Sequence, residues 1–556
     1  MQIRYVTLAD AFQSAAEEAP AAKGYTFLDR SGASHLSFQT LWDEARGYAA
    51  TCQARGIRQG DRVLLTLPTA PDFAQLYLAL QLCGATPCVL PAPGGQEQGP
   101  AVQKLSAVAR QIGARTLIAP DSDVPLLREQ AITPTVWGVS DLPLGHIEAW
   151  RSVRQCADDL AVIQATSGST GAPKCVPLTH RNVLANLAQI GERLQGNGRD
   201  VVVCWLPLYH DMGLIGCFLF VLYWQMQGVF FSPIRFLRDP GLWLAAISHY
   251  RGTLSPAPNF AFALTNKRIS DATLATLELT SWKAAICGGE PIDPAGLQGF
   301  AQRFAACGFV AQALAPAYGM AEAALCVTMV GPDEALQVET ISRQALATEG
   351  IARPLTDPAS ADATTICDCG APVPGTQIRI LDEAGQRLPD GQVGRIWVSG
   401  PAIMQGYVKL PKVNAQVLQD GWFDTGDLGY LREGRLFVTG RAKEVIIIRG
   451  HNYAPTDFEW AAEEVPEVTA GRAVAVGVAD EATGTEQLVL LCEEPRNGKL
   501  KRAELARAIQ LHVGRRTGIL PAQVVLLPRN TIPRTTSGKL QRGLAKERLL
   551  QNIIVK

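Results

Sequence analysis

The stretch DRVLLTLPTAPDFAQLYLALQLCGATPCVLP, residues 61–91, sets the fold class. It contains a short apolar run, an amphipathic segment and a second apolar run. This order indicates a β-α-β unit, in which two parallel strands are joined by a helix that covers the sheet. The same alternation recurs at ARTLIAP, VVVCWLP, GVFFSP, GTLSPAP and KAAICGGEPI. The sequence therefore predicts an α/β fold with parallel sheets.

The pattern changes near residue 375. Residues 376–400, TQIRILDEAGQRLPDGQVGRIWVSG, alternate around two tight turns and predict an antiparallel β subdomain. The later runs RAVAVGV, EQLVLLCEE and AQVVLL, with an amphipathic segment at 501–518, suffice for a small α+β domain. We place the boundary at residues 440–443. Residues 1–440 would form a large N-terminal domain with two α/β subdomains and the β subdomain, and residues 441–556 a small mobile C-terminal domain.

The composition excludes several classes of protein. A chain of 556 residues with 47% hydrophobic residues can fill more than one core. It has 51 Lys and Arg against 52 Asp and Glu, so a nucleic acid is not an expected partner. The thirteen cysteines are scattered and are expected to be buried free thiols of a cytoplasmic protein. Cys367 and Cys369 lack a second cluster of ligands, which argues against a zinc site.

Two segments bear on export and membrane insertion. The N-terminus MQIRYVTLADAFQ has no basic start followed by a long apolar core, so no signal peptide is expected. Residues 213–231, GLIGCFLFVLYWQMQGVFF, are almost long enough to cross a bilayer. Gln225, Gln227 and Gly228 interrupt this segment, which favours a buried helix that leads into a buried strand over a membrane span.

The decapeptide ATSGSTGAPK, residues 165–174, is the strongest local candidate for a binding loop. Its glycines permit close approach of a phosphate to backbone N–H groups, its hydroxyls add donors, and Lys174 adds positive charge. It is not a Walker A sequence, because Pro173 precedes the lysine and Cys175 follows it. A flexible Gly/Ser-rich connection is the alternative.

Seven further motifs accompany this loop. They are WLPLYHDMGLIG (205–216), SPAPNFAF (255–262), CGGEPI (287–292), YGMAEAAL (318–325), GWFDTGDLGYL (421–431), GRAKEVIIIRG (440–450) and PRTTSGKLQR (533–542). In this order the set resembles the adenylate-forming superfamily of acyl-CoA synthetases, peptide-synthetase adenylation domains and luciferases. The first, second and fourth motifs are most similar to the fatty acyl-AMP ligases. The resemblance covers nearly the whole chain.

The resemblance implies the reaction and its cofactors, ATP and Mg²⁺. A fatty or similarly apolar carboxylate would attack the α-phosphorus of ATP, and pyrophosphate would leave. Because two anions must approach each other, cations and oriented donors must supply most of the catalysis. By resemblance, Glu322 and Thr166 would bind the metal, and Lys539 would contact the carboxylate and the α-phosphate. His210 would contact either anion at the mouth of an acyl tunnel formed by residues 214–224 and 255–262.

The resemblance also implies the nucleotide site. Tyr318 would stack on adenine, Asp427 and Arg441 would bind the ribose, and the 166–174 loop would hold the outer phosphates. The full implied set is Thr166, Ser167, Gly168, Ser169, Thr170, Gly171, Lys174, Gly289, Glu290, Pro291, Tyr318, Gly319, Met320, Asp427 and Arg441. Each chemical role has an ordinary alternative: a solvated charge for Glu322 or Lys539, a core aromatic for Tyr318, a turn residue for Asp427 and a core histidine for His210.

The second half-reaction is inferred from a long connection and one substitution. The C-terminal domain would swing about a hinge at Lys443 so that a thiol can reach the acyl adenylate. About forty residues, 325–366, separate two motifs and resemble the insertion that distinguishes acyl-AMP ligases from CoA ligases. Ala321 stands where CoA-forming members usually have threonine. The expected acceptor is therefore a separate acyl carrier protein.

The sequence leaves three alternatives to this acceptor and activity. The first is an acyl-CoA synthetase. The second is a peptide-synthetase domain, which lacks support because its characteristic aspartate motif is absent. The third is a noncatalytic binder of the same fold, which the presence of Lys174, Glu322 and Lys539 disfavours.

Overall fold

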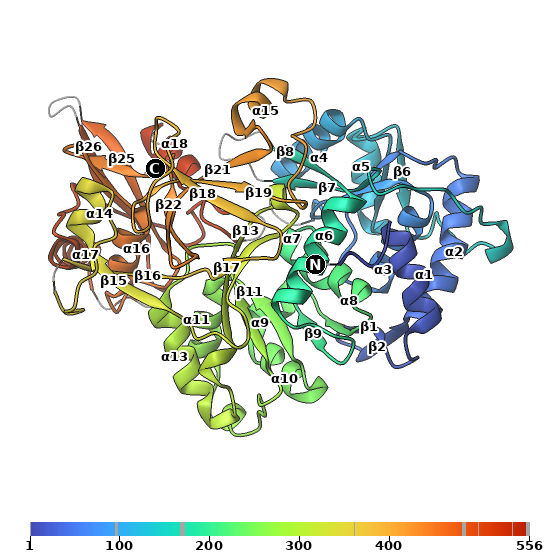
Figure 1. Ribbon diagram of the computed structural model, residues 1–556, viewed down its shortest axis with the longest axis horizontal. Helices are drawn as coiled ribbons and strands as arrows, with labels where there is room; N and C mark the ends of the chain where they lie inside the picture. The colour runs from blue at the N-terminus through green and yellow to red at the C-terminus, as the bar shows by residue number, and fades with distance from the viewer. Residues whose placement is uncertain are drawn as a thin grey trace.

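The computed structural model describes residues 2–94, 98–166, 173–360, 362–480, 485–496, 498, 500–535 and 538–551 (Figure 1). The β-α-β unit predicted from residues 61–91 is present. Parallel strands β3 (Arg62–Leu65) and β4 (Thr86–Val89) are joined by α3 (Pro71–Leu82). They form a parallel sheet, in the order β4-β3-β5-β6, with β5 (Thr116–Ala119) and β6 (Thr135–Gly138). Its helices are α2 (Phe38–Ala54), α3, α4 (Gln98–Ile112) and α5 (Val124–Glu129).

A nine-stranded sheet forms the centre of the molecule, in the order β17-β14-β13-β12-β11-β9-β10-β1-β2. The six strands from β13 to β1 are parallel, whereas β14, β17 and β2 run antiparallel to their neighbours. The strands are β1 (Gly24–Leu28), β2 (Ala33–Ser37), β9 (Val201–Cys204), β10 (Gln227–Phe230), β11 (Leu254–Ala257), β12 (Ala284–Cys287), β13 (Leu314–Gly319), β14 (Cys326–Met329) and β17 (Ala371–Pro372). The helices of this region are α1 (Leu8–Glu18), α6 (His180–Arg193), α9 (Pro233–Arg238), α10 (Gly241–Tyr250), α11 (Asn259–Arg268), α12 (Asp271–Leu274) and α13 (Pro294–Phe304).

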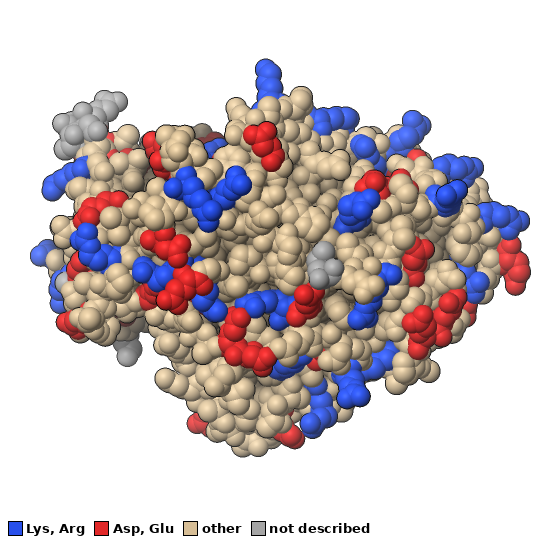
Figure 2. Space-filling view, viewed as in Figure 1, with Lys and Arg blue, Asp and Glu red and all other residues tan. Residues whose placement is uncertain are grey.

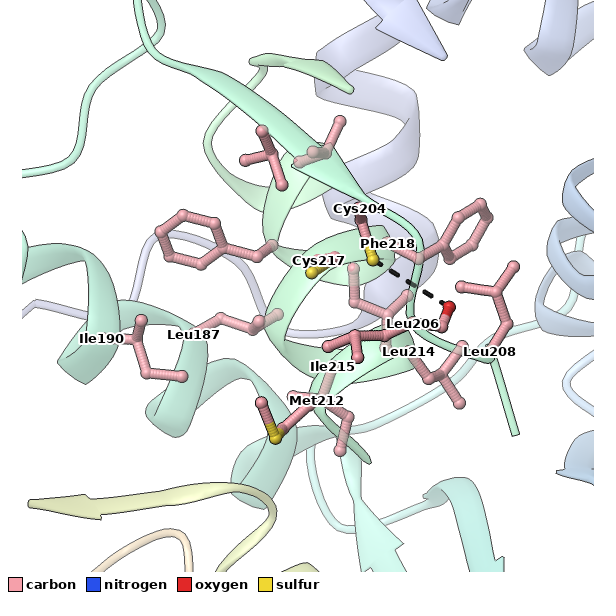
Figure 3. Close-up of a cluster of buried hydrophobic side chains, with 14 of the residues drawn as sticks. Leu187, Ile190, Cys204, Leu206, Leu208, Met212, Leu214, Ile215, Cys217 and Phe218 are labelled. Atoms are coloured by element: carbon pink, nitrogen blue, oxygen red, sulfur yellow. Dashed lines mark hydrogen bonds between the residues drawn. The ribbon is translucent and has the colours of Figure 1, made fainter. Parts of the chain in front are cut away.

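Residues 211–230 form a buried helix that leads into a buried strand, as predicted. The helix comprises α7 (Asp211–Gly213), a π-helical turn (Leu214–Leu219) and α8 (Phe220–Tyr223), and β10 follows it. Figure 3 shows Leu214, Ile215 and Phe218 of the π-helical turn among Leu187 of α6 and Cys204 of β9. Within the described residues, no helix has the length and apolar character needed to cross a membrane.

Residues 376–441 form the predicted antiparallel β subdomain. It contains β18 (Gln377–Leu381), β19 (Gly394–Ser399), β20 (Leu418–Gln419), β21 (Trp422–Arg432) and β22 (Arg435–Arg441), with α15 (Pro411–Val417). The long 325–366 connection is structured in its described part. Its first residues belong to β14 of the central sheet. The element that is additional to this sheet consists of the antiparallel strands β15 (Val338–Ser342) and β16 (Ala363–Cys367) together with helix α14 (Arg343–Glu349).

The C-terminal lobe has its own mixed sheet and cores, on the left of Figure 1. It contains β23 (Ile446–Ile448), β24 (His451–Tyr453), α16 (Pro455–Glu463), β25 (Ala473–Asp480), β26 (Thr485–Glu493), α17 (Arg502–Thr517), β27 (Gln523–Leu527) and α18 (Arg542–Leu550). All cysteines are free thiols, and all but Cys156 are buried. On the face shown in Figure 2, acidic and basic side chains are interspersed.

Candidate active site

A cavity of about 830 Å³ lies where the central sheet, the β subdomain and the C-terminal lobe meet. The carboxyl ends of β12 and β13 open into it, the place where open α/β sheets bind ligands. Its lining includes every described residue that the sequence assigned to a site, namely Thr166, Lys174, His210, Gly289, Glu290, Pro291, Tyr318, Gly319, Met320, Glu322, Asp427, Arg441 and Lys539. The remaining assigned residues, Ser167, Gly168, Ser169, Thr170 and Gly171, lie outside the described residues.

The candidate phosphate loop joins two antiparallel strands, β7 (Leu160–Thr166) and β8 (Lys174–Thr179). This differs from a P-loop, which joins a strand to a helix. Thr166 and Lys174 are paired across the ribbon, and the Thr166 hydroxyl donates to the Lys174 carbonyl at 3.3 Å. Because cross-strand partners point to the same face, both side chains leave the ribbon on one side. The pairing therefore brings a hydroxyl and an ammonium group to the base of the loop.

Glu322 is held beside this ribbon by a tyrosine that the sequence analysis did not identify. The Tyr407 hydroxyl donates to Glu322 Oε1 at 2.7 Å, and Lys174 Nζ lies 4.9 Å from the centre of the Tyr407 ring. Burial raises the pKa of Glu322. No ion pair joins Glu322 to a cation in the parts of the chain that the structure describes. A desolvated carboxylate without a cationic partner suits a divalent metal ion.

Tyr318, Asp427 and Arg441 form a second polar group at the edge of the cavity. Asp427 accepts a hydrogen bond from the Tyr318 hydroxyl at 2.7 Å and pairs with Arg441 Nε at 3.1 Å. Asp427 is 8% exposed, and this burial raises its pKa despite the nearby guanidinium. Register places Asp427 opposite Arg441 on β21 and β22, so the two side chains meet at the junction with the C-terminal lobe.

His210 is oriented by its neighbour Asp211 at the start of α7. Its Nδ1 lies 2.6 Å from Asp211 Oδ1, a distance at which Nδ1–H donates to the carboxylate. The Met212 N–H lies 2.8 Å from the same carboxylate oxygen and 3.3 Å from Nδ1. Burial by itself raises the pKa of Asp211, but the His210 ring and Lys539 outweigh it and lower this pKa to about 2. An ionised aspartate in this position fixes the tautomer of a histidine that lines the cavity.

Lys539 enters the cavity from the C-terminal lobe. A Cβ atom built on Gly289 would lie 3.6 Å from Lys539 Nζ, so the lysine approaches the backbone that follows β12. Gly289 has φ +85°, which favours glycine there. Glu290 accepts a hydrogen bond from the Phe260 backbone at 2.9 Å, and burial raises its pKa. Lys539 interacts electrostatically with two carboxylates of the large domain, Glu290 and Asp211, and acts to lower the pKa of each.

A classic γ-turn follows Glu322. Ala324 has φ +60° and ψ −59°, and the Leu325 N–H donates to the Ala323 carbonyl at 2.7 Å. This conformation is rare and strained for a non-glycine residue. It turns the chain sharply, so that Glu322 contacts Tyr407 while Leu325 approaches Gly216 of the π-helical turn.

Contacts within the C-terminal lobe and between the two lobes support the position of Lys539. In the C-terminal lobe, Arg542 pairs with Glu444 at 2.8 Å and with Glu459 at 2.7 Å, which ties α18 to the turn after Arg441. From the large domain, Arg343 of α14 donates to the Arg516 carbonyl at 3.0 Å and lies 3.8 Å from Asp457. The extra element formed by β15, α14 and β16 therefore packs directly on the C-terminal lobe.

The arrangement can bind and activate two anions in one cavity. Lys174 and Lys539 come from different lobes, Glu322 can hold a metal ion, and Asp427 presents two oxygens to hydroxyl groups. Positive charge at the point where two anions react lowers the barrier to their reaction. Two positioning residues were missed by sequence reasoning. Asp211 is adjacent to His210 in WLPLYHDMGLIG and could have been found, whereas Tyr407 lies in no motif and becomes visible only through its bond to Glu322.

Comparisons with known proteins agree with this geometry. The protein-family model described as AMP-binding enzyme matches residues 12–408. A medium-chain-fatty-acid–[acyl-carrier-protein] ligase of Teredinibacter turnerae is 30% identical over 99% of this chain and 94% of its own. A long-chain-fatty-acid–AMP ligase of Mycobacterium bovis is 32% identical over 96% of each chain. A structure from a study of fatty acyl-adenylate ligases of E. coli and L. pneumophila has a TM-score of 0.92 at 34% identity over 99% of each chain.

Proposed function

Because the chain belongs to the AMP-binding enzyme family, we propose that it converts a fatty acid and ATP to an acyl adenylate and pyrophosphate. It then passes the acyl group to the phosphopantetheine thiol of a separate acyl carrier protein. The observation that carries this proposal is the convergence of Lys539 with the described nucleotide-site residues in one cavity. Similarity to fatty-acid ligases over nearly the whole chain supports the choice of substrate class.

In this proposal each polar residue binds a different part of the nucleotide. Tyr318 packs against adenine, and Asp427 accepts hydrogen bonds from the ribose hydroxyls once its bond to Arg441 is exchanged. Lys174 and the loop after Thr166 bind the outer phosphates. Glu322 and Thr166 hold Mg²⁺, which supplies positive charge to the phosphates when bound. Tyr407 keeps the Glu322 carboxylate oriented.

The acid approaches from the other side of the α-phosphate. Lys539 draws the fatty carboxylate and the phosphate together, because its ammonium group can donate to both. His210, fixed by Asp211, offers a second polar contact at the mouth of the apolar part of the cavity. The carboxylate then displaces pyrophosphate, and the displaced charge remains close to Lys174.

The second half-reaction requires the C-terminal lobe to leave this position. We place the domain boundary after Gly440 and the hinge at Lys443, which is exposed in the turn that follows Arg441. Rotation there withdraws Lys539 and opens a route for a thiol. We assign the acceptor to a carrier protein rather than CoA, because the extra element formed by β15, α14 and β16 contacts the lobe that must move. Buried free thiols are consistent with a cytoplasmic enzyme.

The test is a product assay with the purified chain, ATP, Mg²⁺ and a panel of carboxylic acids. We expect acyl-AMP and pyrophosphate with fatty acids, and transfer to holo carrier protein but not to CoA. Lys539→Ala should lower adenylate formation by about 10²–10³-fold. Lys267→Ala, an exposed lysine on α11, is the matched control and should leave the rate unchanged. Abundant acyl-CoA would contradict the acceptor, and equal turnover by Lys539→Ala would contradict the mechanism.

A further inference from the structure

Lys539 lies at the end of a short loop that is closed by its own hydrogen bonds. The Thr535 N–H donates to the Lys539 carbonyl at 2.8 Å, and the Gly538 N–H donates to the Thr535 carbonyl at 2.9 Å. The Lys539 N–H donates to the Thr535 hydroxyl at 3.1 Å. These bonds fix the shape of the loop but not its place in the lobe. The position of the Lys539 ammonium group therefore depends on what anchors the loop.

Arg534, which immediately precedes the loop, supplies such an anchor. Its guanidinium donates to the Gly538 carbonyl at 2.7 Å and also to the Gly471 carbonyl, in the turn between α16 and β25. Gly471 has φ +70°, and its N–H donates to Glu463 of α16 at 2.7 Å. Arg534 therefore joins the residue before Lys539 to a turn that is itself fixed to a helix.

The chain is tied to the same helix on the other side of Lys539. There, Arg542 pairs with Glu459 of α16 at 2.7 Å. Glu459 and Glu463 are four residues apart, so they lie on one face of α16. Arg534 reaches this face through the glycine turn, whereas Arg542 reaches it directly. Lys539 is thus held from both sides, which restricts the positions that its side chain can take.

Arg534 occupies its place at a cost in stability. Burial lowers the pKa of Arg534, and the like charge of Arg472 acts in the same direction. Arg534 forms no ion pair in the parts of the chain that the structure describes, and its Nε is buried without a hydrogen-bond partner. A buried guanidinium bound to carbonyls alone is less favourable than one paired with a carboxylate. Perturbed groups of this kind cluster at functional sites.

The loop also faces the large domain. A Cβ atom built on Gly538 would lie 3.9 Å from the Phe260 ring. The Phe260 N–H donates to Glu290, and both Lys539 and Arg534 interact electrostatically with this carboxylate. A displacement of the loop would therefore move Lys539 relative to the residues of the large domain that line the cavity.

We propose that Arg534 is a positioning residue for Lys539, and that it holds the lysine loop in the place that adenylate formation requires. Arg534 does not line the cavity, so it acts through Lys539 rather than on the substrates. The inference rests on the proposed function, since it assumes that Lys539 contacts the reacting anions. Because the C-terminal lobe withdraws Lys539 before the thiol arrives, the role of Arg534 is confined to the first half-reaction.

The test measures the two half-reactions separately in the full chain. Pyrophosphate release from ATP and a fatty acid reports adenylate formation, and a synthetic fatty acyl adenylate with holo acyl carrier protein reports transfer. Arg534→Ala should lower adenylate formation by about 100-fold, because a displacement of about 1 Å at a reacting centre has an effect of this size. Transfer should stay close to the wild-type rate. Arg534→Lys keeps a charged donor and should restore part of the lost rate.

Two further variants separate positioning from general stability. The double variant Arg534→Ala, Lys539→Ala should be no slower than Lys539→Ala alone, because Arg534 acts through that lysine. The matched control is Arg502→Ala. Arg502 is an exposed arginine of the same lobe that also donates to a backbone carbonyl, that of Leu526, and its loss should leave both half-reactions unchanged.

Equal losses in both half-reactions, or additive losses in the double variant, would show a structural role alone and overturn the inference. A wild-type rate of adenylate formation by Arg534→Ala, with Lys539→Ala impaired, would also overturn it and leave the proposed function intact. Wild-type turnover by Lys539→Ala would contradict the proposed function, and this inference with it.

Discussion

The two ends of the cavity are built on opposite principles. At the nucleotide end, charged side chains touch one another: Asp427 contacts Tyr318 and Arg441, and Asp211 contacts His210. The apolar arm of the cavity is lined by Ile190, Leu194, Val202, Phe220 and Leu254, and the neighbouring Arg193 does not line the cavity but pairs with Glu334. The first region depends on single contacts, whereas the second depends on shape.

This difference predicts different responses to mutation. Electrostatic contacts at a reacting centre act in a low dielectric, so losing one removes several kcal/mol of transition-state stabilisation. Apolar walls contribute in proportion to the area in contact, so a change there alters preference by small steps. Substitutions at the nucleotide end should therefore abolish turnover, whereas substitutions in the apolar arm should change which acid the enzyme prefers.

The largest effect is expected for Glu322→Ala. Removal of the proposed metal-binding carboxylate should lower adenylate formation by about 10³-fold, because the metal ion would be held less tightly and the lysines alone would not neutralise the phosphates. The measurement is pyrophosphate release at several Mg²⁺ concentrations. Glu383→Ala, an exposed carboxylate in the turn after β18, is the control. A variant that retained wild-type rates and magnesium dependence would remove Glu322 from the site.

Asp427→Ala should have the next largest effect, and on a different parameter. The variant loses both oxygens proposed to bind the ribose, so KM for ATP should rise about 100-fold while KM for the acid changes little. Initial rates at varied ATP and varied acid separate the two constants, again with Glu383→Ala as control. An equal change in both KM values would indicate damage to the whole site. It would contradict the proposed difference between the nucleotide end and the apolar arm of the cavity.

The two ends also differ in how much of them the sequence could predict. The polar residues lie in short motifs whose spacing is informative, so every described member of the predicted nucleotide site lines the cavity. The α/β class and the antiparallel subdomain followed from strand periodicity in the same way. The residues of the apolar arm could not be predicted from the sequence, because residues such as Ile190, Val202 and Met329 come from separate elements and resemble ordinary core residues. The packing of helix α6 against the central sheet brings them together.

The acid sensitivity of Asp211 tests the polar end through stability. Its folded pKa of about 2 lies below the ordinary value of 3.8, so the ionised carboxylate stabilises the fold above about pH 4. That contribution is about 2 kcal/mol and is lost as the pH falls through 2. Asp211→Asn should therefore melt at a lower temperature than wild type at pH 7, with a gap that narrows below pH 4. Asp420→Asn, an exposed aspartate, should show no gap, and a gap independent of pH would reject the ion pair as its cause.

The smallest effect should come from Ala324, which joins the two ends. Its φ of +60° is strained for alanine, and Ala324→Gly relieves that strain but loses a buried methyl group and adds freedom to the unfolded chain. These terms nearly cancel, so stability should change by less than about 1 kcal/mol and activity should remain. Ala324→Val instead adds a branched Cβ at positive φ and should lower both the melting temperature and adenylate formation. Equal behaviour of the two variants would show that the γ-turn does not position Glu322 relative to Leu325.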